Sequence, residues 1–405
     1  MSSEFLPTKL GEVLDFANGK TSPERSNNGR WPVYGSNGII GTADATNSIA
    51  DTIVIGRVGS YCGSVYLSAT QCWVTDNAIR GNPKGNNSAV FLFYLLKHLN
   101  LNNWRSGSGQ PLLNQSILNS IDVYIPEPPE QQEIGTFLSC IDDRIALLRE
   151  TNATLEAIAQ ALFKSWFVDF DPVHARARGE QPAGLAPELA ALFPDSFEES
   201  ALGMVPKGWQ AEPLDEIADF LNGLALQKYP PEGDETLPVI KIAQLRKGDT
   251  VGADRASRNI KPEYIIQNGD VLFSWSGSLE VEVWCGGEGA LNQHLFKVTS
   301  QRFQKWFYLR WTKTHLTNFK HIAASKATTM GHIQRKHLTE AMVVVPSSQV
   351  LAEADKIFGP LLDQWINNAE QAQTLANLRD TLLPRLISGQ LRLPDAEQQL
   401  KDLAV

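Results

Sequence analysis

The charge pattern of the chain indicates phosphate binding. Two stretches, Asn77 to Ile121 and Gly289 to Thr339, contain no Asp or Glu, although the 405-residue chain holds 45 acidic residues. The second stretch carries nine Lys or Arg and five His, with aromatic residues between them. A basic surface without carboxylates favours nucleic acid because DNA releases its counterions on binding. We therefore expect double-stranded DNA to be a partner; the alternative interpretation is an ordinary solvated surface.

Polar side chains in these stretches and in other loops have the chemistry to contact DNA. Arg binds guanine bidentately, and Asn and Gln bind adenine in the same way. The candidates are Arg57, Arg80, Lys84, Arg105, Gln110, Asn114, Arg246, Lys247, His294, Lys326, Thr328, Thr329, His332, Arg335 and Lys336. For each of them the alternative is a turn former or a phosphate contact, because phosphate and sugar take half or more of such contacts.

A search for catalytic residues finds none. The string Gly19-Lys20-Thr21 has Leu14 where a phosphate-binding loop needs a glycine, and no dinucleotide-binding glycine pattern follows a strand. Asp169 and Asp171 would be the metal pair of a stand-alone nuclease, but they precede Pro172, where a helix end is expected. The four cysteines form no CxxC pair, so we expect no catalytic residue and no metal ligand.

An internal repeat organises the elements that must position these residues. The string LGEVLDFANG (10–19) matches LDEIADFLNG (214–223), and IDVYIP (121–126) matches AMVVVP (341–346). In both copies short apolar runs predict strands, at 53–58 and 271–275, and a short amphipathic helix follows, at 89–99 and 302–315. A loop at 106–116 or 325–336 and a strand ending at Pro126 or Pro346 complete each copy. We expect one scaffold that displays two different surfaces.

A long helix follows each copy. In the first, from about Glu130 to about Phe167, apolar residues recur every seven positions, as in a coiled coil, and the second helix repeats the pattern. Each seam contains one asparagine, Asn152 or Asn368, and pairing them in an antiparallel arrangement sets mostly large residues against small ones. This register places Arg379 against an apolar residue, where its long side chain is expected to reach solvent. The alternative is that each helix packs on its own module.

Length and charge bound the remaining possibilities. A chain of 405 residues predicts two or three domains. The net charge of −9 divides into 0 for residues 1–127, −8 for 128–205, +2 for 206–346 and −3 for 347–405, so the acidity avoids both modules. No apolar stretch reaches the roughly 20 residues of a membrane span, and the N-terminus lacks a signal-peptide pattern, so a cytoplasmic protein is expected.

Several motifs resemble those of one family. The string from Pro126 to Val173, PEPPEQQEIGTFLSCIDDRIALLRETNATLEAIAQALFKSWFVDFDPV, closely resembles the central repeat of type I restriction-modification specificity subunits. VPKGW at 205–209, TTMGHI at 328–333 and LRDTLLPRLISGQL at 378–391 resemble the second module and distal repeat of that family. The resemblance covers essentially the whole chain.

This resemblance implies a non-catalytic DNA-reading subunit with an α+β fold. Two mixed α/β target recognition domains, related by the internal repeat, would each read half of a bipartite asymmetric site, and an antiparallel coiled coil of two long helices would separate them. The implied segments are residues 1–127, recognition domain 1; 128–171, central helix; 172–205, connector with one short helix; 206–346, recognition domain 2; 347–391, distal helix; and 392–405, C-terminal tail.

The family also implies partners and cofactors. The helices would dock two methyltransferase subunits, and two restriction and translocase subunits would complete the complex. S-adenosylmethionine, ATP and Mg would bind those partners, with no cofactor on this chain. The first module departs from the family in having SGSGQP (106–111) where the second has TTMGHI. Alternatives are a specificity subunit of a related type II system with a fused partner, and, in a different class, an acidic coiled-coil scaffold or DNA mimic.

Overall fold

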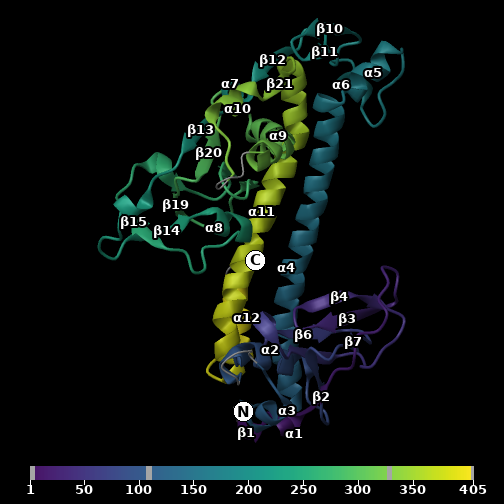
Figure 1. Ribbon diagram of the computed structural model, residues 1–405, viewed down its shortest axis with the longest axis vertical. Helices are drawn as coiled ribbons and strands as arrows, with labels where there is room; N and C mark the ends of the chain where they lie inside the picture. The colour runs from purple at the N-terminus through teal and green to yellow at the C-terminus, as the bar shows by residue number, and fades with distance from the viewer. Residues whose placement is uncertain (1–4, 106–111, 326–330, 403–405) are drawn as a thin grey trace. The chain divides into compact units, whose positions relative to one another are not determined.

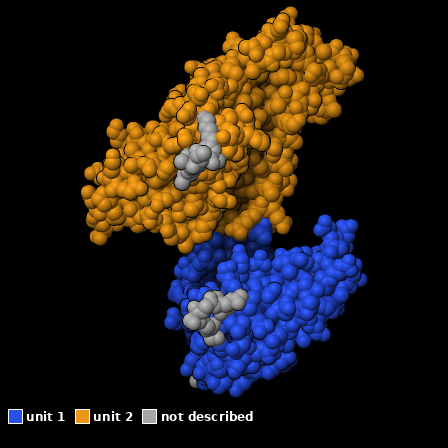
Figure 2. Space-filling view, viewed as in Figure 1, with its two compact units in different colours: residues 1–146, 374–405 blue, residues 147–373 orange. Residues whose placement is uncertain are grey.

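The chain folds into two compact units of mixed helix and sheet. The computed structural model describes residues 5–105, 112–325 and 331–402. Unit 1 comprises residues 1–146 and 374–405, and unit 2 comprises residues 147–373 (Figure 2). Both long helices contribute residues to each unit (Figure 1). Each unit therefore combines one copy of the sequence repeat with segments of both helices.

Unit 1 contains two small sheets and a separate strand pair. The four-stranded sheet has the order β2 (Leu14–Asn18), β8 (Ala78–Pro83), β5 (Thr52–Gly56) and β6 (Val65–Ser68), all antiparallel. The second sheet is β4 (Gly38–Ala43), β3 (Trp31–Gly35) and β7 (Trp73–Val74), in which β3 and β7 are parallel. Strand β1 (Leu6–Lys9) pairs with β9 (Asp122–Ile125). Helices α1 (Leu10–Val13), α2 (Ala89–His98), α3 (Gln115–Ser120) and α12 (Leu393–Asp402) complete the unit.

Unit 2 repeats this arrangement with one additional strand in its second sheet. Its first sheet is β13 (Asp219–Asn222), β20 (Leu295–Thr299), β17 (Val271–Ser274) and β18 (Val281–Val283). Its second is β15 (Arg255–Ser257), β14 (Thr236–Ile240), β19 (Gly289–Leu291) and β16 (Ile265–Ile266), with β14 and β19 parallel. Strand β12 (Gln210–Pro213) pairs with β21 (Met342–Val345), and α7 (Leu214–Ile217), α8 (Ile242–Lys247), α9 (Lys305–Ser325) and α10 (Arg335–Glu340) are its short and medium helices.

The repeated Asn-Gly motif makes the same close backbone contact in each unit. The Gly19 amide donates to the Ala78 carbonyl at 3.0 Å, and the Gly223 amide donates to the Leu295 carbonyl at 3.0 Å. A Cβ at Gly19 would lie 2.0 Å from a backbone oxygen of Thr75, and one at Gly223 would lie 2.2 Å from that of Asn292. Only glycine fits such an approach, which explains why the motif occurs twice.

The sheets that contain β5 and β17 pack an apolar face on the helix of their own unit. Strand β5 is buried along its whole length and shares a core with residues of α2 such as Phe91 and Leu95. In unit 2, Phe273 of β17 stacks on Phe319 of α9, with ring centroids 5.7 Å apart. The predicted strands 53–58 and 271–275 are therefore present as β5 and β17, each slightly shorter than expected.

The prediction for the second amphipathic helix was wrong at both ends. Helix α9 covers Lys305–Ser325 rather than 302–315, whereas α2 ends one residue before the expected end. The turn before α9 is held by Ser300, whose Oγ accepts the backbone N–H groups of Arg302 and Phe303. The helix continues beyond His315 because Phe319 and Ala323 extend its buried face.

The long helices are α4 (Pro128–Phe163), followed by a π-helical turn at Lys164–Val168, and α11 (Ser348–Ile387). In unit 2, Asn368 bonds Asn152 and Trp166 meets Phe358; in unit 1, Leu138 and Leu382 share a core. Because residue numbers rise along α4 as they fall along α11, the helices lie antiparallel in each unit. The expectation that the Arg379 side chain reaches solvent was wrong. Arg379 pairs with Asp142 and Asp380 instead, and its side chain is 21% exposed.

The connector is more structured than expected. It contains two helices, α5 (Asp171–Ala177) and α6 (Pro187–Ala190), and a hairpin of β10 (Phe197–Ser200) and β11 (Gly203–Pro206). The prediction of a single short helix was therefore wrong. The two carboxylates considered for a metal bind the helix end instead: Asp169 pairs with Lys164, and Asp171 accepts the Ser165 hydroxyl at 2.7 Å. Among the described residues, no helix is long and apolar enough to span a membrane.

Candidate nucleic-acid interface

Three segments of unit 2 meet where β17 ends. The Trp275 amide donates to the His294 carbonyl at 3.3 Å, and the Ile333 amide donates to the Trp275 carbonyl at 3.0 Å. Ser276 and His332 form an isolated antiparallel bridge next to these bonds. The structure thus brings together two sequence candidates, His294 and His332, that are 38 residues apart in the chain.

The side chains at this corner form one polar and aromatic cluster. His294 Nδ1 lies 2.9 Å from Ser276 Oγ, and its Nε2 lies 3.4 Å from the side-chain amide nitrogen of Gln293. Because an amide nitrogen only donates, the contact with Gln293 is a hydrogen bond in the tautomer whose Nε2 is unprotonated. The Trp275 ring lies 5.8 Å from the His294 ring and 6.4 Å from the His332 ring. Imidazole and amide edges beside an aromatic face suit contacts with bases.

Trp275 is a residue that the sequence analysis missed. It is half-buried, and its Nε1 donates to Asn222 Oδ1 at 2.9 Å, which ties the ring to the end of β13. The available signal was a tryptophan that ends an apolar strand and is followed by Ser-Gly-Ser. The sequence analysis places it only at the end of the predicted strand 271–275 and gives it no role in binding.

Arg335 and Lys336 begin α10 beside this cluster. The Arg335 Nη2 donates to the Phe220 carbonyl at 3.0 Å, and its guanidinium lies over the Phe296 ring at 5.6 Å. Both side chains remain on the exposed surface of unit 2. One edge of the Arg335 guanidinium is therefore held by the protein while the residue keeps its positive charge at the cluster.

The matching corner of unit 1 has different side chains. Arg57 occupies the position of Trp275: its amide donates to the Asn77 carbonyl at 2.9 Å, and its carbonyl accepts the Leu113 amide at 3.0 Å. The Arg57 Nη1 donates to the Asp76 carbonyl at 3.3 Å. Asn114 is the N-cap of α3 and accepts the Ile117 amide at 2.9 Å. The backbone corner is thus shared between the units, whereas its chemistry is not.

Exposed groups lie close to this corner in unit 1. Arg105 is exposed after the 3-10 turn Leu101–Trp104. Its charge acts on the buried Cys62 thiol, which donates to the Arg57 carbonyl at 3.2 Å. Tyr61 and Trp104 are 53% and 42% exposed. Sequence reasoning missed both aromatic residues because exposure cannot be read from residue type alone.

Four candidates lie outside both the unit 2 cluster and the matching corner of unit 1. Arg80 donates to the Asn47 carbonyl, and Lys84 donates to the Gly11 carbonyl at 2.6 Å. Arg246 and Lys247 end α8, where Lys247 pairs with Asp249 at 3.1 Å and lines a cavity of about 410 Å³ beside α4 and α11. Arg80, Lys84 and Lys247 thus contact other groups of the protein, and Arg246 lies in the last turn of α8. The remaining candidates, Gln110, Lys326, Thr328 and Thr329, lie outside the described residues.

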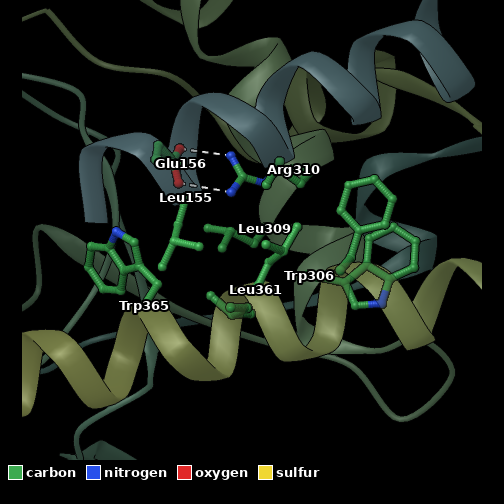
Figure 3. A pocket seen from close by; sticks show the side chains of 10 residues that line it. Leu155, Glu156, Trp306, Leu309, Arg310, Leu361 and Trp365 are labelled. Atoms are coloured by element: carbon green, nitrogen blue, oxygen red, sulfur yellow. Dashed lines mark hydrogen bonds and ion pairs between the residues drawn. The ribbon is translucent and has the colours of Figure 1, made fainter. Parts of the chain in front are cut away.

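A tightly packed junction connects the unit 2 module to the long helices. Leu155 and Glu156 of α4, Trp306, Leu309 and Arg310 of α9, and Leu361 and Trp365 of α11 surround a cavity of about 10 Å³ (Figure 3). That volume holds no more than about one water molecule, so this is a packing contact and not a ligand site. No group of three or more His, Cys, Asp or Glu among the described residues could hold a metal ion.

Comparisons with known proteins agree with a DNA-contacting role. The family model described as type I restriction modification DNA specificity domain matches residues 3–157 and 206–378. The type I restriction enzyme MjaIX specificity subunit of Methanocaldococcus jannaschii is 26% identical over 326 residues, which cover 77% of this chain and 71% of the relative. The HindI specificity subunit of Haemophilus influenzae is 26% identical over 339 residues, covering 71% and 72%.

A solved structure shares the fold. The crystal structure of the type I restriction-modification S subunit from M. genitalium superposes with a TM-score of 0.63 at 18% identity, and the alignment covers 95% of this chain and 96% of that one. At this identity the similarity concerns the fold alone. It extends over both units and both long helices.

Proposed function

Because the chain belongs to the family of type I restriction-modification DNA specificity domain proteins, we propose that it is the DNA sequence-specificity subunit of a type I restriction-modification complex. It is a targeting subunit rather than a catalytic one, as its curated relatives are named specificity subunits. Residues 1–127 and 206–346 are the two target recognition domains, and each reads one half of a bipartite asymmetric site.

The observation that carries this proposal is that the two units share the backbone arrangement of this corner but place different side chains on it. Equivalent backbone hydrogen bonds hold Arg57 in unit 1 and Trp275 in unit 2, while the groups around them differ. A common scaffold with different contact groups reads two different half-sites. Arg57 and Arg105 serve the first half-site, and Trp275, His294 and His332 the second.

The long helices set the distance between the half-sites and dock the partners. A helix rises about 1.5 Å per residue, so a helix of 36 residues, the length of α4, has the dimension of one or more DNA turns. The antiparallel coiled coil, in register at Asn152 and Asn368, offers the acidic segments of the chain to two methyltransferase subunits. Two restriction and translocase subunits complete the complex, with S-adenosylmethionine, ATP and Mg bound by these partners in the cytoplasm.

Methylation mapping tests the proposal. The chain is co-expressed with its cognate methyltransferase subunit, and methylated adenines in the host DNA are located by single-molecule sequencing. We expect a bipartite asymmetric motif that disappears when this chain is deleted and changes in one half when residues 1–127 are exchanged. An assembled complex without chain-dependent methylation would contradict the proposal and favour a scaffold or DNA mimic.

A further inference from the structure

In unit 2, a half-buried carboxylate of α4 anchors the recognition module to the long helices. Glu156 receives two hydrogen bonds from Arg310, Nη1 to Oε1 at 2.7 Å and Nη2 to Oε2 at 2.8 Å (Figure 3). Lys313 adds a third contact at 3.1 Å. The Arg310 side chain is 8% exposed and that of Glu156 is 32% exposed. This bidentate ion pair fixes the angle between α4 and α9 as well as the distance between them.

The surrounding packing supports the same geometry. Trp306 and Leu309 of α9 fill the space between α4 and α11, where the cavity measures only about 10 Å³. The Trp306 Nε1 also donates to Asp355 Oδ1 of α11 at 2.9 Å. Helix α9 is therefore held to both long helices, and any rotation of the module would open the junction or break the ion pair.

Unit 1 has a corresponding anchor made from different residues. Tyr94 of α2 is buried, and its hydroxyl donates to Asp142 Oδ2 of α4 at 2.7 Å. Arg379 of α11 pairs with the other oxygen of the same carboxylate. One acidic residue of α4 thus connects the module helix and the second long helix.

The two carboxylates occupy equivalent positions on α4. Asp142 and Glu156 each follow a seam residue, Ile141 and Leu155, and the two seam residues are separated by two heptads. Their partners, Tyr94 and Arg310, come from the module helix of their own repeat. The two units reach the same arrangement with unlike side chains, so the position on α4 is the shared feature.

We propose that Asp142 and Glu156 are positioning residues that fix the direction in which each recognition domain faces, and so determine how strictly the spacer length of the DNA site is enforced. This inference rests on the proposed function. One added base pair turns the second half-site by about 35° and moves it by about 3.4 Å. A module held by a bidentate ion pair cannot follow that rotation, whereas a module released from its anchor can.

The test measures spacer discrimination by the assembled methyltransferase complex. Substrates carry both half-sites of the wild-type motif with the native spacer or with one base pair added or removed. We expect Glu156→Gln to reduce the preference for the native spacer at least tenfold while both half-site sequences stay unchanged. Asp142→Asn should act in the same direction through the other module.

Matched controls change nearby charges that do not join module to helix. Glu282 lies on β18 of the module, 3.7 Å from Lys313, so Glu282→Gln alters the same charge network without touching α4. Asp143 is the exposed neighbour of Asp142 and contacts Ser139 of its own helix at 3.5 Å. Both control variants should keep the wild-type spacer preference.

The outcomes separate the inference from the proposed function. A wild-type complex without a bipartite motif would defeat the proposed function. A wild-type motif with an unchanged spacer preference in Glu156→Gln would overturn the inference alone, as would an equal loss of methylation at every spacer. If that variant fails to assemble, Arg310→Lys replaces it in the test, because lysine keeps the charge but cannot make both hydrogen bonds to Glu156. This variant must relax the spacer preference; an unchanged preference overturns the inference.

Discussion

The side-chain amide of Asn368 donates from Nδ2 to Oδ1 of Asn152 at 3.0 Å, between helices whose other seam residues in unit 2 are apolar. Asn152 in turn donates to the Trp365 carbonyl at 2.9 Å, and Gln364 donates to Asn368 at 2.8 Å. Both asparagines are buried. A polar pair satisfied in this way permits one alignment of α4 and α11, since any shift would leave a buried amide unpaired.

Replacing one member of this pair should cost more than replacing both. In Asn368→Leu, the Asn152 oxygen loses its donor, and we expect a loss of about 1–3 kcal/mol in the free energy of unfolding. The double variant Asn152→Leu with Asn368→Leu removes both polar groups and should be more stable than that single variant. Urea unfolding of the wild type, both single variants and the double variant measures the coupling; additive single effects would contradict it.

The contact between these asparagines could be inferred from the sequence, but other features could not. A seven-residue period and one polar residue per seam are local patterns, so they align two helices without knowledge of the fold. The end of α9 depends on whether Phe319 finds a core, which is a tertiary property. Likewise, residue type and local charge could not distinguish Arg80, which bonds a backbone carbonyl, from the exposed Arg105.

These two arginines should therefore respond differently to alanine substitution. We expect Arg105→Ala to weaken DNA binding by the assembled complex and to reduce the slope of log affinity against log salt by about 1, with unchanged unfolding. Arg80→Ala should chiefly lower stability, because it removes a donor to the Asn47 carbonyl. Fluorescence anisotropy over a salt series and thermal melting measure both effects; the reverse assignment would place Arg80 at the DNA.

The cluster at the end of β17 yields a prediction for the second half-site. His294→Ala removes a ring that bonds Ser276 and lies beside Trp275. We expect specific DNA affinity to fall by about 10-fold or more, since a base contact contributes about 1–3 kcal/mol. Competition between the wild-type site and sites altered in either half measures the effect. Discrimination should relax in the half that we propose is read by residues 206–346; relaxation in the other half would exchange the domain assignments.

Two carboxylates near Lys313 should influence stability in opposite directions with pH. Burial favours a higher pKa for Glu156, but the hydrogen bonds from Arg310 and the charge of Lys313 outweigh it and lower the pKa below 4.5. For Glu282, burial dominates over Lys313 and raises the pKa above 4.5. The ionisation of Glu156 therefore stabilises the fold above about pH 4.5. The raised pKa of Glu282 lowers stability progressively as the pH rises above 4.5, and the loss is complete once the pH exceeds that raised pKa.

At pH 7, Glu156→Gln should lower the free energy of unfolding by about 1–3 kcal/mol, because Arg310 stays buried without its counter-charge. Glu282→Gln should leave it unchanged or raise it, since a buried charge disappears. The stabilising contribution of Glu156 is lost as the pH falls from 4.5 through its lowered pKa, so the Glu156→Gln difference should shrink over that interval. The Glu282→Gln difference should shrink as the pH falls from the raised pKa towards 4.5 and vanish below that pH. Urea unfolding midpoints between pH 3 and pH 7 measure both curves; a Glu156→Gln difference that grows on acidification would show that the ion pair does not stabilise this junction.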